Sequence, residues 1–372
     1  MNATSSSLIH SMAQNYRCCR ADFPSNLKPE HLDVLPGEQA TLLAGLSTLH
    51  AVIGDIYDHF AELTPTDSHW SDREYCYRAI EGPVKLLWAL GVAGQFVQGP
   101  DGLELQVSRS SLDEVLKRCG VRDARAAFAV LETVGFHLLW RGAGGLPCPA
   151  GYKKCGAVAV CYPPHNDALL HAVAYYAFRL PEKKSGRKEK GPIFEVLLRA
   201  DFRPLLPGYT FHIPHLPATE EEVTRTFDAE VLAFWRALTG FMASRHPEYR
   251  LFLRVPRSRN RSWVADYSTK DGDYGLWSIF VEEEGLSVRI VFNDKSLPTL
   301  LAHIDELSPH FQERYLTHVA CKDCVRCGKH VFYTHGDHVH RLCRSPWYMS
   351  PYLRLEDLPD IERLVDFRLA NP

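Results

Sequence analysis

The segment from residue 111 to residue 162 constrains the fold most, because its hydrophobic pattern and turn residues specify a fixed order of short elements. In chain order, the pattern predicts a helix over 111–119, a glycine turn at 120–121, a second helix over 122–134, and a hairpin with strands near 136–141 and 156–162. The Ser111-Leu-Asp-Glu114 segment has the form of a capping box, so the first helix is expected to begin there. This is the element order of a winged helix, and we expect that fold here.

A similar order of elements occurs twice in this part of the chain. One copy covers residues 86–116 and the other residues 129–173. Each copy runs from a helix end through Gly91 or Gly135 into two strands and then into the polar start of another helix. The repeat indicates two related α-β-β-α units within one domain.

Four basic residues are candidates for contacts with nucleic acid. In a winged helix that binds DNA, the N-terminal part of the second helix meets the major groove, so Arg122 and Arg125 would contact bases. Lys117 and Arg118 would contact phosphates. Alanines crowd the second helix, and Asp123 at its start suits the helix dipole better than DNA. A winged helix used only for packing or dimerisation therefore remains an open alternative.

The whole chain is expected to be an α+β protein with five regions. These are an irregular N-terminal segment at 1–35, a helical, winged-helix-like domain at 36–180, a basic linker or loop at 181–192, an α+β domain at 193–318, and a cysteine-rich segment with a C-terminal helix at 319–372. Apolar residues at three- and four-residue spacing predict helices from Glu38 to Phe60 and from Asp72 to about Leu90.

The second half of the chain has the pattern of an antiparallel sheet between helices. A capping box from Thr219 to Glu222 predicts a helix that continues to about Ser244. Alternating apolar residues predict four strands in meander order at 249–255, 262–267, 274–282 and 286–292, followed by a helix after Pro298. This α-β-β-β-β-α order predicts helices on one face of an antiparallel sheet.

An arginine-rich turn lies between the first two of these predicted strands. It contains Arg254, Arg257, Arg259 and Arg261 and is followed by Trp263. Guanidinium groups bind phosphate and carboxylate well, so the turn is a candidate site for an anionic small molecule. The alternative, which we favour from the pattern alone, is a solvated hairpin tip.

Cysteines near the C-terminus form the motif with the most specific chemistry. Two consecutive CxxC steps are followed by a later cysteine, and the residues concerned are Cys321, Cys324, Cys327 and Cys343. Thiolates at this spacing favour zinc, and a closed set of four favours a structural role, so we expect residues 319–372 to bind zinc. In the alternative Cys₃His set, one of His330, His338 and His340 replaces a thiolate. A four-cysteine iron–sulfur cluster is a further alternative, ranked lower because no proline follows the last cysteine.

Composition restricts the function without defining it. The formal net charge is −3, so any attraction for nucleic acid must come from a local patch. The 11 cysteines are odd in number and unevenly spaced, which favours reduced thiols in the cytoplasm.

The longest nearly uncharged apolar run, which starts at Leu86, is too short to cross a membrane, and the first residues lack the pattern of a signal peptide. Motifs for phosphate loops, dinucleotides, serine hydrolases and zinc proteases do not occur, so the sequence provides no positive argument for an enzyme.

One part of the chain resembles a known group of proteins. The helix that ends in Tyr-Arg at 249–250, the basic turn before a tryptophan strand, and the later strand pair resemble uncharacterised bacterial proteins with a small α+β domain of unknown function. The resemblance covers about residues 225–345 and implies a fold and a bacterial origin, but no catalytic residues. We therefore expect a cytoplasmic bacterial regulatory or interaction protein that binds DNA. The alternative is a protein that handles a small molecule or metal through its C-terminal sheet. Under either hypothesis, nothing in the sequence indicates the oligomeric state of the chain.

Overall fold

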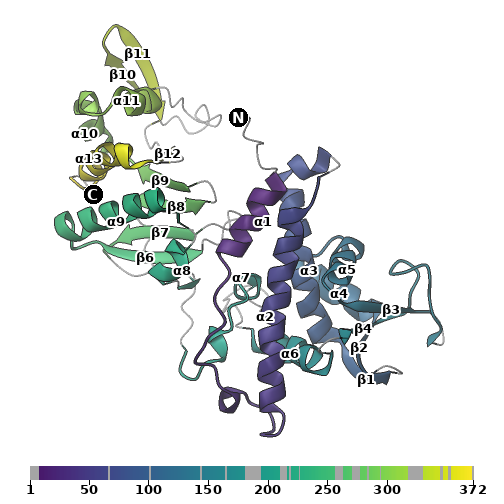
Figure 1. Cartoon of the computed structure of the whole chain (residues 1–372). Coiled ribbons are helices and arrows are strands. Elements are labelled where there is room, and N and C mark those ends of the chain that lie inside the picture. The colour runs from purple at the N-terminus through teal and green to yellow at the C-terminus, as the bar shows by residue number, and fades with distance from the viewer. Residues whose placement is uncertain are drawn as a thin grey trace. The chain divides into compact units, whose positions relative to one another are not determined.

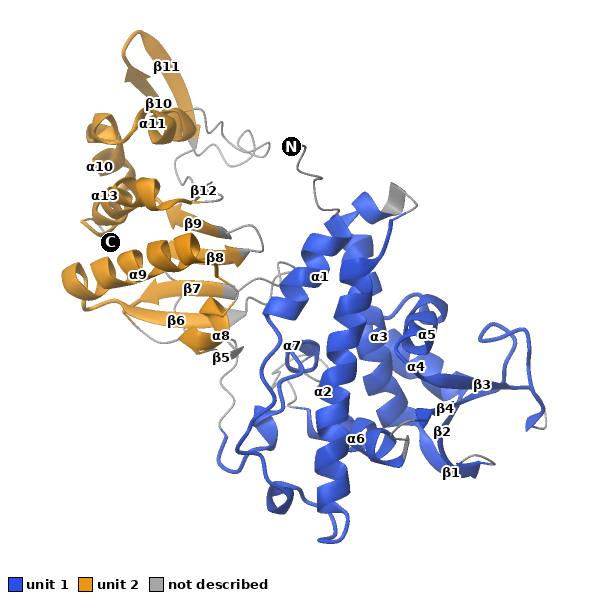
Figure 2. Cartoon of the chain, viewed as in Figure 1, with its two compact units in different colours: residues 1–216 blue, residues 217–372 orange. Residues whose placement is uncertain are grey.

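The computed structural model divides the chain into two compact units, residues 1–216 and 217–372 (Figure 2). It describes residues 8–65, 68–99, 102–142, 145–163, 166–180, 194–209, 216–217, 219–225, 227–255, 263–269, 277–282, 285–293, 295–316, 330–343, 347–350 and 353–370. Helices and antiparallel sheets occur in both units, so the predicted α+β class is confirmed.

Long helices form the core of the first unit. They are α1 (Leu8–Cys18), α2 (Gln39–Glu62), α3 (Arg73–Ala93) and α6 (Asn166–Arg179) (Figure 1). Both α2 and α3 pack against α6. They do so through glycines, because a Cβ atom at Gly45 would overlap the carbonyl of Ala168, and one at Gly91 would lie 2.5 Å from the carbonyl oxygen of Val173. Close contact between helix backbones is therefore built into this core.

Two hairpins and two short helices pack beside α3. In chain order these are β1 (Gln95–Gly99), β2 (Gly102–Ser108), α4 (Arg109–Cys119), α5 (Ala124–Thr133), β3 (His137–Arg141) and β4 (Ala157–Cys161). The strands form one antiparallel sheet in the order β1-β2-β4-β3, with Leu105 opposite Val160 and Val160 opposite Leu138. Along the chain, α3, β1, β2 and α4 are followed by α5, β3, β4 and α6.

The ends of these helices differ from the sequence-based expectation. Ser108, and not Ser111, is the N-cap of α4, since its Oγ accepts a hydrogen bond from the Ser111 backbone N–H at 3.2 Å. The second helix begins at residue 124, because Asp123 caps it by accepting from the N–H of Ala126 at 3.0 Å. Gly91 lies inside α3, and Gly94 is the C-cap. At the two N-termini a side-chain oxygen outside the helix accepts from the first turn, and at Gly94 the backbone N–H donates to the carbonyl of Leu90.

Two segments that lack a strong pattern of their own belong to the first unit. Residues 8–18, expected to be irregular, form α1, and the Tyr16 hydroxyl donates to Glu81 of α3 at 2.6 Å. Residues 194–209, expected to lie in the C-terminal domain, form α7 (Phe194–Leu198) and the 3-10 turn η5 (Arg203–Leu205). Fully buried Asp201 forms a bidentate pair with Arg203 at 2.6 and 2.8 Å, which anchors this segment.

Helix α2 is the longest described helix of the first unit and is strongly apolar. By length and composition alone, its 24 residues are apolar enough to cross a membrane. Half of the most apolar window is buried within the fold, where α2 packs against α1, α3 and α6. Burial in a protein core explains the apolar character equally well, so this is weak evidence for a membrane span.

The second unit contains a six-stranded antiparallel sheet. Its strands are β5 (Leu216–Pro217), β6 (Arg250–Val255), β7 (Trp263–Ser268), β8 (Trp277–Glu282), β9 (Gly285–Val291) and β12 (Trp347–Ser350). The order β12-β9-β8-β7-β6-β5 includes the predicted meander. The predicted helix from Thr219 is interrupted: it forms α8 (Glu220–Thr224) and α9 (Ala229–Arg245), because Asp228 provides a second N-cap.

The second unit also contains further helices, short turns and a second hairpin. They are α10 (Leu297–Ala302), the turn η6 (Ile304–Glu306), α11 (Pro309–Leu316), the hairpin β10 (His330–His335) and β11 (His338–Cys343), the turn η7 (Leu355–Asp357) and α13 (Leu358–Leu369). The short turns η1 (Pro29–His31) and η2 (Ser68–Ser71) belong to the first unit. The predicted terminal helix corresponds to α13, which packs against α9 and β9.

Candidate nucleic-acid interface

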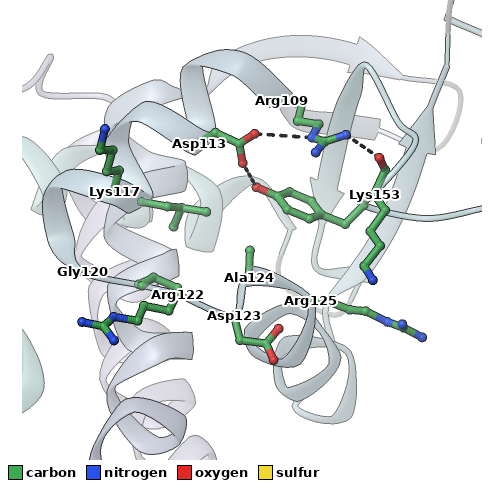
Figure 3. Close-up of a pocket in the computed structure, with 12 residues that line it drawn as sticks. Arg109, Asp113, Lys117, Gly120, Arg122, Asp123, Ala124, Arg125 and Lys153 are labelled. Carbon is green, nitrogen blue, oxygen red and sulfur yellow. Dashed lines mark hydrogen bonds and ion pairs between the residues drawn. The ribbon is translucent and has the colours of Figure 1, made fainter.

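A surface cavity of about 640 Å³ lies at the N-terminal end of α5 (Figure 3). Its walls come from α4, from the turn between α4 and α5, and from the loop between β3 and β4, which we call the wing loop (residues 142–156). Lys117, Arg122 and Arg125, three of the four residues predicted to contact nucleic acid, line this cavity. Arg118 is exposed on α4 but does not line it.

The turn between the two helices fixes the position of Arg122. Gly120 adopts the left-handed conformation with φ of 77°, which favours glycine, and closes the C-terminus of α4. The N–H of Val121 then donates to the carbonyl of Leu116 at 3.0 Å. Because Asp123 caps the next helix, Arg122 lies on a short connection held at both ends.

The charge around the cavity is opposite in sign to that of the whole chain. Five cationic and two acidic side chains line it, whereas the formal net charge of the protein is −3. Asp113 is engaged with Arg109, whose Nε lies 3.4 Å from its carboxylate, and Asp123 caps α5. Within the described part of the chain, no carboxylate forms an ion pair with the other four cations, which are Lys117, Arg122, Arg125 and Lys153. Figure 3 shows Lys117 and Arg122 on one side of the cavity and Arg125 and Lys153 on the other.

Tyr152 attaches the wing loop to the helices. Its ring packs against Phe128 and Trp140 at centroid distances of 5.5 and 6.1 Å, and its hydroxyl donates to the carboxylate of Asp113 on α4. Arg109 lies over the same ring and donates to the Lys153 carbonyl at 2.5 Å. Burial, followed by the hydrogen bond to Asp113, raises the pKa of Tyr152, so the hydroxyl stays protonated at neutral pH.

Replacing Tyr152 is expected to release the wing loop. Tyr152→Ala removes both the ring contacts and the hydrogen bond, so it should lower the free energy of unfolding by about 1–2 kcal/mol. Hydrogen exchange of residues 145–156 should become faster, while Tyr152→Phe, which keeps the ring, should show a smaller change in both measurements. Equal effects of the two variants would mean that the ring contacts do not hold the loop.

Two of the five cationic residues that line this cavity, Arg109 and Lys153, were not predicted from the sequence. The sequence did contain a pattern that indicates Lys153: two adjacent lysines, Lys153 and Lys154, in a glycine-rich loop between the two predicted strands of a hairpin. Both lysines are exposed in the structure. Arg109 was missed because α4 begins two residues earlier than the expected start at Ser111.

The predicted anion site in the second unit can be placed only in part. Arg257, Arg259 and Arg261 lie outside the described residues, and only the backbone is described for Arg254 in β6 and Trp263 in β7. Trp277 of β8 is fully buried, and its ring stacks on that of Tyr267 with the ring centroids 4.6 Å apart. It belongs to the core of the sheet.

Polar residues are buried on neighbouring strands of the same sheet. Asp266 of β7 and Ser278 of β8 are cross-strand partners, and the Ser278 hydroxyl donates to the Asp266 carboxylate. Ser278 in turn pairs with Arg289 of β9, whose guanidinium lies over the ring of Phe280 at 5.4 Å. Because partner residues point to the same side of a sheet, these side chains share one face. Alternating hydrophobicity did not identify them.

The predicted metal site lies mostly outside the described residues. Cys321, Cys324 and Cys327 are among those not described, and only the backbone is described for His330 and Cys343. The strand register pairs His330 with Cys343 at the open end of the β10–β11 hairpin. His340 pairs with Tyr333 farther along the hairpin, and its ring lies 3.1 Å from the carbonyl of Leu316; His338 is the partner of His335 next to the turn. Within the described ranges, no group of three or more metal-binding side chains occurs.

Comparisons with known proteins found no match among protein-family models, among curated proteins or among solved structures.

Proposed function

We propose that the chain is a cytoplasmic bacterial regulatory protein whose first unit binds double-stranded DNA as a winged helix. The single observation that carries this proposal is the group of exposed cations around the cavity at the start of α5, four of which pair with no carboxylate of the described residues. The topology supports it, because the second helix of a winged helix is followed by a hairpin whose last strand lies between the other two, and here β4 lies between β2 and β3.

In this proposal the N-terminal part of α5 enters the major groove. Arg122 and Arg125 contact base edges, while Lys117, Arg118 and Lys153 contact phosphates on either side. The exposed face of α5 also carries Ala126 and Ala129, and these short side chains allow close approach of the helix to the bases. The alanines that argued against DNA contact in the sequence are therefore compatible with it.

The first experiment measures retention of bacterial genomic fragments by the full chain at low and moderate salt. The three phosphate-contacting cations would give a salt dependence with a slope of about −3 on a log–log plot, and selected fragments should share a sequence. No retention at either salt concentration would overturn the proposal and leave the alternative of a packing or dimerisation module.

For the second unit we propose a structural zinc ion held by Cys321, Cys324, Cys327 and Cys343. The spacing of the cysteines and the position of Cys343 beside His330 at the open end of a hairpin support this choice. In a Cys₃His site, His330 is the favoured histidine ligand, because the strand register places it opposite Cys343 at the open end of the hairpin. His338 and His340 are less favoured, because the register places them farther from that end.

Metal analysis tests the zinc proposal directly. The purified chain is expected to contain about one zinc ion, and a chelator should lower the melting temperature of the second unit, because structural zinc contributes to folding. Cys324→Ser should lose the metal, whereas Cys18→Ser, in α1, should retain it. Iron in place of zinc, or full metal content in Cys324→Ser, would contradict the assignment.

A second candidate function is binding of a small anionic molecule by the sheet of the second unit. The polar face that contains buried Asp266, buried Ser278 and half-buried Arg289 favours it, together with the arginine-rich turn. An anion that raises the melting temperature of the wild type, with the shift lost on Arg-to-Ala changes at 257, 259 and 261, would support this function.

A further inference from the structure

A second cavity of about 500 Å³ lies in the first unit and is also lined by the turn between α4 and α5. It is lined by the C-terminal end of α2, by Trp70 of η2, and by α3 and α5. Val121, Arg122 and Asp123 line both this cavity and the cationic cavity described above. A volume of this size is typical of sites for small organic molecules.

The walls of this cavity are mainly apolar and aromatic. Phe60 of α2, Trp70, and Tyr75 and Ala79 of α3 line it, and the ring of Trp70 packs edge-on against Tyr75 at 5.0 Å. Ala126, Ala129 and Val130 of α5 line it as well. Aromatic rings together with short side chains leave room for a flat, apolar group.

The polar groups of the lining favour an anionic head group. Arg78 donates through Nε to the carbonyl of Glu74 at 3.2 Å, and no carboxylate of the described chain forms an ion pair with Arg78 or Arg122. Asp123 is the single carboxylate among the lining residues, and it already accepts from the N–H of Ala126. Burial lowers the pKa of His59, so its imidazole is neutral at pH 7 and available as a hydrogen-bond partner.

We propose that this cavity binds a small aromatic carboxylate, with the ring between Trp70 and α5 and the carboxylate at Arg78 and Arg122. Binding would weaken DNA contact, because Arg122 cannot pair fully with both the ligand and the nucleic acid. This coupling rests on the proposed function of the first unit, whereas the ligand site itself does not.

Calorimetry without DNA tests the site, with 2-naphthoate as the probe and 2-naphthalenemethanol as its neutral counterpart. We expect saturable binding of the carboxylate, about tenfold tighter than that of the alcohol, because the guanidinium groups recognise the charge. Arg78→Leu should weaken naphthoate binding by about the same factor. Arg118→Leu, a matched change on the exposed surface of α4, should leave it unchanged.

A variant that fills the cavity gives an independent test. Ala126→Trp places a large side chain between α5 and Trp70 and should abolish naphthoate binding while the circular dichroism spectrum stays that of a folded protein. No detectable binding to the wild type would overturn the site. Equal binding of acid and alcohol, or equal losses for the changes at Arg78 and Arg118, would overturn the assignment of the carboxylate to Arg78.

The coupling is measured as DNA retention with and without saturating 2-naphthoate. We expect retention to fall in the wild type and to fall less at the same naphthoate concentration in Arg78→Leu, which should still bind DNA because Arg78 does not line the cationic cavity. Unchanged retention in the wild type would overturn the coupling. A chain that retains no DNA would overturn the coupling together with the proposed function, while calorimetry would still decide the ligand site.

Discussion

Reversing the charge of Arg122 and Arg125 together is expected to abolish detectable DNA retention by the full chain at moderate salt. Each arginine that contacts a base contributes about 1–3 kcal/mol, and each reversal also replaces attraction to the phosphate backbone by repulsion. The combined loss should exceed about 100-fold in affinity, since about 1.4 kcal/mol corresponds to a factor of ten. Fluorescence anisotropy with a retained genomic fragment measures this loss directly.

Single reversals separate specific contact from a general effect of charge. Arg122→Glu and Arg125→Glu should each weaken binding by at least about tenfold. Lys28→Glu changes the net charge by the same amount on another exposed part of the first unit, where Lys28 lies 4.0 Å from Glu30, and it should have a much smaller effect. Unchanged retention in the double variant would show that α5 is not the helix that reads DNA.

Gly45→Ala is expected to destabilise the first unit by about 3 kcal/mol or more, although it adds a single methyl group. The new Cβ would overlap the backbone carbonyl of Ala168 in α6, and a backbone atom in a packed helix cannot move aside without separating the two helices. Gly91→Ala should act in the same direction, because the added methyl group would lie 2.5 Å from the carbonyl oxygen of Val173. Chemical denaturation of the full chain measures both losses.

The same substitution without a close neighbour is the control. Gly240 lies inside α9, and no described atom is within 4 Å of a Cβ placed at that position. Gly240→Ala should therefore stabilise the second unit by about 0.5–1 kcal/mol, as expected for glycine replaced by alanine within a helix. If Gly45→Ala were as harmless as Gly240→Ala, the close packing of α2 against α6 would be wrong.

The sequence predicted well the elements whose signals are local. The helix, turn, helix and hairpin order between residues 109 and 161 follows from hydrophobic spacing and from Gly120, and the capping box from Thr219 to Glu222 is present, with hydrogen bonds of 2.9 and 3.1 Å. Predictions were less accurate where a cap decides the boundary, as at Ser108 and Asp228. Periodicity indicates that a helix exists, but the oxygen that caps it determines where it begins.

Only the part of the candidate DNA site that is local in the sequence was predicted. Lys117, Arg122 and Arg125 lie within about nine residues along two consecutive helices, so a local reading brings them together. Lys153 joins them only because the pairing of β4 with β2 and β3 returns the chain to the start of α4, where Arg109 bonds to its carbonyl. No local pattern connects positions that are 44 residues apart.

Spacing, caps and turns within short stretches were enough to predict the α+β class and the four-strand meander of the second half, but not the edge strands β5 and β12. Only the tertiary structure decided that residues 8–18 and 194–209 pack into the first unit, that α2 and α3 approach α6 through glycines, and that an apolar cavity lies beside α5. These features arise from contacts between segments distant along the chain, whose geometry is fixed by close packing and strand pairing rather than by the residues of any one segment.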